Sequence, residues 1–155
     1  MIISTETLQK FDVPGPRYTS YPTADRFVEA YGEAQYLQAL QERHLNPRSV
    51  SSPLSLYVHV PFCASLCYYC ACNKIITGNY QKALDYLGDL TKELALILPH
   101  LGEAQTVSQV HLGGGTPTFF KDQELRAWVR LLQSAFHWQP GGEFSVEVDP
   151  RTVDE

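Results

Sequence analysis

Strand-like segments alternate with amphipathic helical segments over most of the sequence after residue 50. Strands are expected at 54–60, 107–112 and 143–148, where short apolar or alternating runs are closed by proline or glycine. Apolar side chains recur at helical spacing over 79–98 and 122–136. The order strand, helix, strand, helix, strand predicts parallel strands joined by right-handed helical crossovers. The expected fold class is therefore α/β.

All four cysteines lie within ten residues, directly after the first expected strand, at Cys63, Cys67, Cys70 and Cys72. A disulfide framework would suit a short secreted chain and would spread its cysteines to join distant segments. A structural zinc site prefers paired knuckles from separate segments, and only one such loop is present. Three thiolates at the C-x3-C-x2-C spacing fit an iron–sulfur cluster better, with one iron left open for chemistry. Cys72, two residues further on, is not expected to be a ligand.

Three patterns that could bind a ligand each follow an expected strand: the cysteine loop, the glycines 113–115, and Glu147. In parallel α/β folds, ligands bind at the edge formed by the C-terminal ends of the strands. A tight turn would also explain the glycines, and a strand glutamate is usually solvated. The glycines are not a phosphate loop, because the lysine of that motif is absent. The coincidence of three patterns at one edge favours a binding site.

The composition is that of an ordinary globular protein of about one domain, because 44% of the 155 residues are hydrophobic and 19% are charged. The net charge of −5 argues against a general nucleic-acid binder, which would carry a basic patch. No run approaches the ~18 apolar residues of a membrane span. The acidic beginning of the sequence is not that of a signal peptide. We therefore expect a cytoplasmic protein with reduced cysteines.

The region 1–50 is expected to be an arm followed by a short helix at 33–43. The prolines and glycine of 14–16 cannot continue a helix or a central strand, so the beginning of the chain is expected to be ordered loop or turn. The stretch 17–22 is either a surface arm packed by its tyrosines, or an arm over an active site. In the second case Arg17 could bind a carboxylate with two hydrogen bonds.

The cysteine spacing together with its aromatic surroundings resembles the signature of the radical S-adenosylmethionine (SAM) enzymes. Over most of its length the chain resembles one branch of these enzymes, the oxygen-independent coproporphyrinogen III oxidases. The resemblance lies in the stretches 15–22, 56–74, 113–118 and 146–151. The resemblance implies a partial radical SAM barrel of βα units, preceded by the N-terminal arm and helix.

The expected division of the chain is therefore an arm and helix at 1–50 and the first part of the barrel at 51–155. Because three strands do not close a barrel, we expect the chain to be the N-terminal part of a longer protein. Met1 is expected to be a true start and Glu155 a truncation. Further residues are expected to be needed for activity.

The resemblance also implies the cofactors and their ligands. A 4Fe–4S cluster would be bound by Cys63, Cys67 and Cys70, and SAM by its open iron, with a second SAM nearby. Glu147 would bind the ribose hydroxyls, and the glycine backbone would receive the amino group of SAM. The full set of SAM-binding residues implied is Tyr57, Tyr69, Gly114, Gly115, Thr116 and Glu147.

The implied reaction is the oxidative decarboxylation of coproporphyrinogen III to protoporphyrinogen IX in anaerobic haem biosynthesis. A radical derived from SAM would abstract hydrogen from a propionate side chain. The partners implied are the porphyrinogen and a one-electron donor, with a monomer as the full-length form and neither nucleic acid nor a membrane involved. No further catalytic residue is assigned. Two alternatives stay open: a haem-trafficking relative without oxidase activity, and a non-catalytic zinc-binding module.

Overall fold

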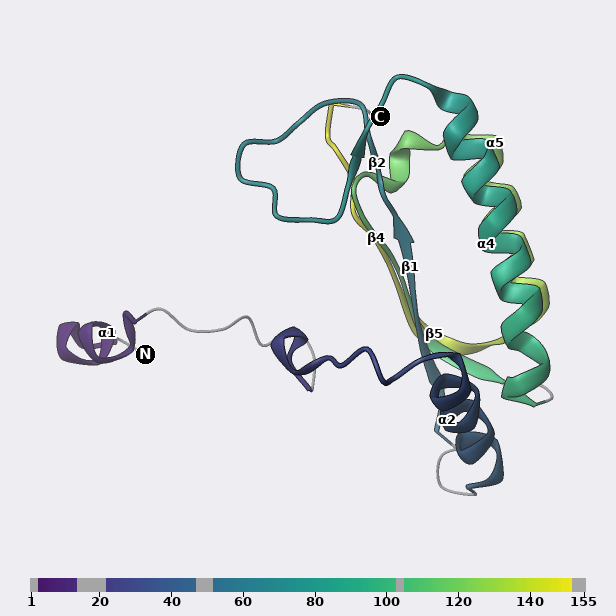
Figure 1. The fold of residues 1–155 in the computed structure, drawn as a ribbon. Helices are drawn as coiled ribbons and strands as arrows, with labels where there is room; N and C mark the ends of the chain where they lie inside the picture. Colours follow the sequence, from purple (N-terminus) through teal and green to yellow (C-terminus); the bar gives the residue numbers. More distant parts are fainter. Residues whose placement is uncertain (1–2, 14–21, 47–51, 103–104, 152–155) are drawn as a thin grey trace. The chain divides into compact units, whose positions relative to one another are not determined.

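The computed structural model describes residues 3–13, 22–46, 52–102 and 105–151 (Figure 1). The chain divides into two compact units, residues 1–37 and 38–155. The domain boundary expected after residue 50 stays a prediction. Most of the stretch 15–22, including Arg17, lies outside the described residues.

The first unit contains helix α1 (Thr5–Phe11) and the short 3-10 turn η1 (Ala24–Arg26). The expectation of loop or turn throughout the beginning of the chain is therefore wrong for α1. The hydroxyl of Ser4 accepts the N–H of Thr7 at 3.1 Å and so caps the first turn of this helix. Helix α2 (Glu33–Leu45) confirms the helix expected at 33–43 and continues into the second unit.

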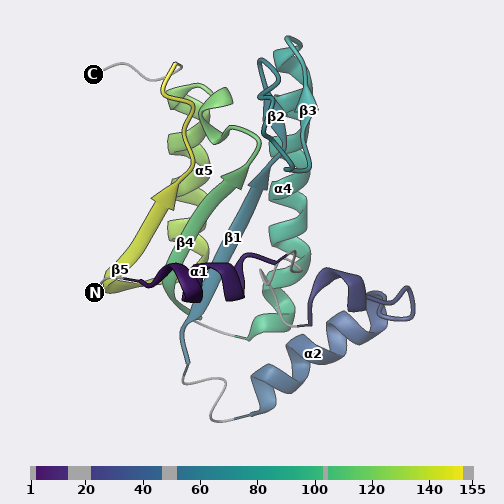
Figure 2. The same ribbon diagram turned by 90° about the vertical axis from the view of Figure 1, so that its left-hand side faces the viewer.

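A three-stranded parallel sheet forms the centre of the second unit, in the order β1, β4, β5 (Figure 2). The strands are β1 (Leu54–Val60), β4 (Thr106–Gly114) and β5 (His137–Val146). Helices α4 (Tyr80–Leu101) and α5 (Asp122–Ala135) connect them and cover the same face of the sheet (Figures 1 and 2). The α/β class and the parallel crossovers are confirmed.

Two element bounds differ from the sequence expectation. The pattern predicts that Pro99 ends α4, yet the helix continues to Leu101 and ends before Gly102, whose φ is 78°. A proline so near the helix end removes only one late hydrogen bond, so the last turn persists.

The third strand was expected at 143–148, and β5 instead covers His137–Val146. Its pairing with β4 shifts between Val107 and Gln109, which pair with Trp138 and Glu143. The strand therefore bulges around Gly141, whose φ of 74° favours glycine.

The main core lies between the sheet and the two helices. Val107, Val110 and Leu112 of β4 are each 2% exposed, because β4 is the central strand. They pack with Leu90, Leu101, Trp128, Leu132 and Phe136. A second cluster, made of Val60, Phe62, Ala83 and Phe120, lies where β1 ends. This second cluster lies at the C-terminal edge of the sheet. Within the described ranges, no helix is both long enough and apolar enough to span a bilayer.

Candidate cofactor-binding site

A short second sheet closes the cysteine loop, and the sequence pattern did not predict it. Strand β2 (Phe62–Cys63) pairs in parallel with β3 (Ile75–Ile76). Two backbone hydrogen bonds join the ends of the loop, from the N–H of Ile75 to the carbonyl of Pro61 at 2.7 Å and from Thr77 to Cys63 at 3.0 Å. We use the name cysteine loop for residues 63–74. The loop leaves the sheet directly after β1, as the sequence predicts.

The cysteine loop borders a cavity of about 740 Å³ at the C-terminal edge of the sheet. We call it the edge cavity. Its lining includes all four cysteines, together with Tyr69, Gly114, Gly115, Thr116, Glu147 and Arg151. The patterns that the sequence placed at one edge therefore do meet around one space. Of the implied ligands, only Tyr57 is not part of this lining.

None of the four cysteines forms a disulfide. Cys63 is buried, Cys67 and Cys70 are half-buried, and Cys72 is exposed. The sulfur of Cys63 lies 3.4 Å from the hydroxyl oxygen of Thr116. Three free thiols at chelating spacing on one cavity are the donors that an iron–sulfur cluster needs. Within the described ranges, no three Cys, His, Asp or Glu side chains already converge on a point that could hold a metal ion.

Cys70 and Cys72 differ in their acidity. The backbone N–H of Cys72 lowers the pKa of Cys70, and Lys74 lowers it further. The pKa of Cys72 is raised, chiefly by its side-chain hydrogen bond with Cys70. The ammonium of Lys74 donates to the carbonyls of Cys70 and Cys72 at 3.3 Å each. The contact between the two side chains therefore favours the thiolate form of Cys70 over that of Cys72.

The glycine run is packed against protein atoms on its side-chain side. A Cβ on Gly115 would lie 2.7 Å from the carbonyl carbon and oxygen of Pro61, and one on Gly114 would lie 2.6 Å from the ring of His59. Gly114 also has a φ of 112°, which favours glycine. These glycines are therefore required for the close approach of β4 to the end of β1.

The N–H groups of the run are used inside the fold. Gly115 donates to the carbonyl of Val60 at 2.7 Å and Thr116 donates to Phe62 at 2.9 Å. Gly114 donates to the Oε2 of Glu147 at 3.0 Å. A ligand at this edge would consequently meet carbonyl oxygens as its backbone partners, and these accept hydrogen bonds from amino groups.

Glu147 lies directly after β5, and its backbone N–H extends the sheet by donating to the carbonyl of Leu112 at 2.9 Å. Besides the Gly114 contact, its Oε1 lies 3.3 Å from the Nε2 of His111, which donates to it. In the neutral ring, the Nδ1 of His111 then accepts from the hydroxyl of Ser145 at 2.7 Å. The carboxylate is held at the cavity wall with 49% of the side chain exposed.

Tyr57 lies on β1 beside this network. Its ring stacks on His111 with the centroids 5.5 Å apart, and its hydroxyl lies 3.3 Å from the Nδ1 of His59. The Nε2–H of His59 donates to the carbonyl of Asn73 at 2.9 Å, so the ring links β1 to the cysteine loop. Burial, followed by the nearby Glu147 and Cys72, raises the pKa of Tyr57. Its expected role at SAM stays a prediction.

Sequence reasoning missed a cluster at the far side of the cavity. Arg151 holds Asp149 through its Nε at 2.9 Å and its Nη2 at 2.6 Å. The same Nη2 lies 3.1 Å from the hydroxyl oxygen of Ser65, in the cysteine loop. The ion pair lowers the pKa of Asp149 to about 2. An aspartate followed by proline is a turn signal, and it could have drawn attention to Asp149.

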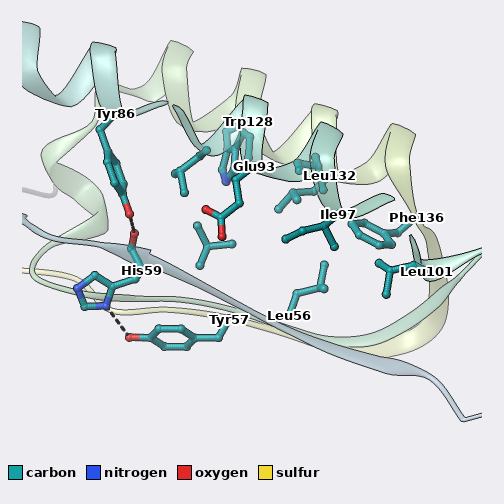
Figure 3. Close-up of a pocket in the computed structure, with 13 residues that line it drawn as sticks. Leu56, Tyr57, His59, Tyr86, Glu93, Ile97, Leu101, Trp128, Leu132 and Phe136 are labelled. Carbon is teal, nitrogen blue, oxygen red and sulfur yellow. Dashed lines mark hydrogen bonds between the residues drawn. The ribbon is translucent and has the colours of Figure 1, made fainter. Parts of the chain in front are cut away.

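A second cavity, of about 350 Å³, lies between β1 and the helices (Figure 3). Its walls are mostly apolar and include Leu56, Ile97 and Leu101. Tyr86 closes one end by donating its hydroxyl to the carbonyl of His59 at 2.9 Å (Figure 3). The cysteines do not line this cavity, but Tyr57 does.

Comparison with known proteins places the chain among one set of relatives, although no family model matches it. The oxygen-independent coproporphyrinogen III oxidase of Pseudomonas aeruginosa is 43% identical over 151 residues, covering 96% of this chain and 32% of that protein. The Escherichia coli oxidase is 46% identical, with 95% and 31% covered. The Mannheimia haemolytica sequence of the same name is 41% identical, with 92% and 93% covered.

A solved structure of a relative with the same activity in its name also matches this chain. The coproporphyrinogen III oxidase of Escherichia coli, described as a radical SAM enzyme, matches with a TM-score of 0.79 at 43% identity. The match covers 96% of this chain and 31% of that one. The chain thus spans about a third of the length of the Pseudomonas and Escherichia relatives. The α/β architecture described above is that of a partial radical SAM domain.

Proposed function

Because the chain belongs to the family of oxygen-independent coproporphyrinogen III oxidases, we propose that it forms the cofactor-binding part of a radical SAM enzyme. The proposed reaction is the oxidative decarboxylation of two propionates of coproporphyrinogen III to give protoporphyrinogen IX. We do not expect residues 1–155 to catalyse it alone, because the sheet has only three strands among the described residues. The proposed partners are the porphyrinogen and a one-electron donor, and the proposed compartment is the cytoplasm, where thiols stay reduced.

The observation that carries the proposal is the lining of the edge cavity. Three free thiols, a glycine run and a carboxylate face one space at the C-terminal edge of a parallel sheet. Cys63, Cys67 and Cys70 would hold a 4Fe–4S cluster, and we expect cluster binding to draw their sulfurs together. When bound, the cluster would supply the electron for the reductive cleavage of SAM. The protein supplies binding, orientation and exclusion of water.

The remaining lining residues have properties that suit SAM. The carboxylate of Glu147 can accept hydrogen bonds from two ribose hydroxyls, as acidic residues do in other folds. The carbonyls of the glycine run can accept hydrogen bonds from an amino group, whereas the N–H groups of Gly114 and Gly115 are already used within the fold. The ring of Tyr69 is 90% exposed at the cavity and is available to lie against adenine. Thr116 and Tyr57 complete the proposed set, and a second SAM is part of the proposal.

The test is anaerobic reconstitution of the protein with iron and sulfide, followed by iron analysis and EPR of the reduced sample. We expect about four irons per chain and a signal that shifts when SAM is added. Cys67→Ala should lose the cluster, whereas Cys72→Ala, which alters an exposed cysteine of the same loop, should keep it. Colourless, zinc-containing protein would support the zinc-binding alternative instead.

The substrate needs its own assay. The assay uses a protein that spans the full length of the longer relatives, reduced and supplied with SAM. It should convert coproporphyrinogen III to protoporphyrinogen IX with release of carbon dioxide. A cluster that responds to SAM without any turnover of the porphyrinogen would contradict the oxidase assignment. That outcome would favour the haem-trafficking alternative, which binding of haem by the same protein would check.

A further inference from the structure

The segment after Glu147 forms a turn that presents a guanidinium to the edge cavity. The backbone N–H of Arg151 donates to the Oδ1 of Asp149 at 3.0 Å, which closes an Asx-type turn around Pro150. The guanidinium then binds both oxygens of the same carboxylate, with contacts from 2.6 to 3.2 Å. Backbone and side chain of Arg151 are therefore both held by Asp149, so the position of the guanidinium is largely determined by the turn.

The positioned guanidinium reaches the cysteine loop. Its Nη2 donates to the hydroxyl of Ser65 at 3.1 Å, across 86 positions of sequence. Ser65 lies midway between Cys63 and Cys67. The contact therefore joins the first half of the loop to the segment that carries Glu147. The two walls of the edge cavity are tied together at this point.

The middle of the loop has little packing of its own, because Leu66 is 58% exposed, Tyr68 is fully exposed and Tyr69 is 90% exposed. The two ends of the loop are held differently, because the β2–β3 pair joins them and Lys74 donates to the carbonyls of Cys70 and Cys72. A polar tether at Ser65 thus acts where apolar burial holds the loop least.

We propose that Arg151 is a positioning residue, which holds the first half of the cysteine loop over the edge cavity through Ser65. The proposal rests on the proposed function for its purpose, since the position of the loop sets where Cys63 and Cys67 present their sulfurs. The contacts that carry it join the protein's own residues. Asp149 serves the same end indirectly, because it orients the guanidinium.

The first test uses the metal-free protein and follows hydrogen exchange of peptides from residues 63–72. Arg151→Gln and Ser65→Ala should each raise the exchange rate of these peptides by about twofold to fivefold, as expected for an exposed charge-assisted contact. The double variant should show no more than the larger single effect. Arg126→Gln is the matched control, because Arg126 pairs with Asp122 at 2.7 Å on α5, away from the cavity. It should leave these peptides unchanged.

Arg151→Lys distinguishes the contacts of the guanidinium with Asp149 and Ser65 from the effect of its positive charge. A lysine keeps the positive charge but lacks the planar fork that binds Asp149 and Ser65 together, so its exchange rates should resemble those of Arg151→Gln. Wild-type rates in Arg151→Lys, unchanged rates in Arg151→Gln, or strictly additive effects in the double variant would each overturn the proposal.

The second test uses the reconstituted protein and measures the rate at which a chelator removes iron. The same variants should release iron about twofold to fivefold faster than wild type and Arg126→Gln, in line with the loosened loop. Unchanged release from a loop that exchanges faster would overturn the link between loop position and cluster binding. A wild-type protein that takes up no cluster would instead refute the proposed function, while the exchange result would still decide the role of Arg151.

Discussion

Gly115→Ala tests whether the close approach of β4 to the end of β1 builds the site. The φ of Gly115 lies outside the left-handed region, so alanine adds no backbone strain there. The added Cβ would meet the carbonyl carbon and oxygen of Pro61 at 2.7 Å and the carbonyl oxygen of Phe62 at 2.9 Å. These are backbone atoms, so no flexible side chain can move aside. The β1–β2 junction itself must shift.

The magnitude follows from the overpacking that this shift relieves only in part. Inserting a methyl group into such a packed contact costs about 1–3 kcal/mol of unfolding free energy. The upper half of that range is expected, because the hydrogen bond from the N–H of Gly115 to the carbonyl of Val60, at 2.7 Å, lengthens as the chains separate. Since Cys63 follows Phe62 directly, the same shift should weaken cluster binding.

Urea unfolding followed by circular dichroism measures the change in unfolding free energy. Gly88→Ala is the matched control, since Gly88 lies within α4 and a Cβ there meets no atom within 4 Å. That variant should be stabilised by about 0.5–1 kcal/mol through helix propensity. If Gly115→Ala were as stable as wild type, the reasoning about close approach would be refuted.

Three further predictions concern the core and the charges. Leu112→Ala, at a fully buried position of the central strand, should cost about 2–5 kcal/mol, and an unfolding midpoint close to that of wild type would contradict the assigned core. Tyr86→Phe removes the hydrogen bond to the carbonyl of His59 and should cost about 1 kcal/mol, whereas an equally stable variant would show that water replaces the hydroxyl. The pKa of Asp149 falls from 3.8 to about 2 in the fold, so its ion pair with Arg151 stabilises the protein above the unfolded pKa and this contribution is lost as the pH decreases through the folded pKa. The stability difference between wild type and Asp149→Asn should therefore be constant above a pH of about 5 and shrink below it, and a difference that does not depend on pH would contradict the ion pair.

The helices and strands and their order could be predicted from the sequence because each element depends mainly on residues that are close to one another in the chain. The alternation in 54–60 and the helical spacing after Asn79 each describe contacts of a few residues' reach, and β1 and α4 formed where those patterns predicted. Parallel pairing followed from the order of the elements. The cysteine spacing is likewise local, and with the parallel order it placed the candidate site at one edge of the sheet.

The bounds were less predictable where tertiary pairing competes with local signals. Gly141 and Gly142 mark a turn in the sequence, but β4 pairs with β5 on both sides of them, so the strand continues through a bulge. Similarly, Pro99 marks a helix end, whereas α4 keeps its last turn with Leu101 buried in the core. In both cases long-range packing outweighed a local preference of modest size.

The sequence by itself determined the α/β class, the order of the elements and the chemistry that gathers at one edge, because periodicity and spacing are local properties. Only the tertiary structure decided which side chains meet there. It stacked Tyr57 on His111, outside the lining of the edge cavity. It also used the N–H of Gly114 to hold Glu147, and it joined Arg151 to Ser65 across 86 positions. Such contacts leave no periodic trace, since they exist only after the sheet brings distant segments together.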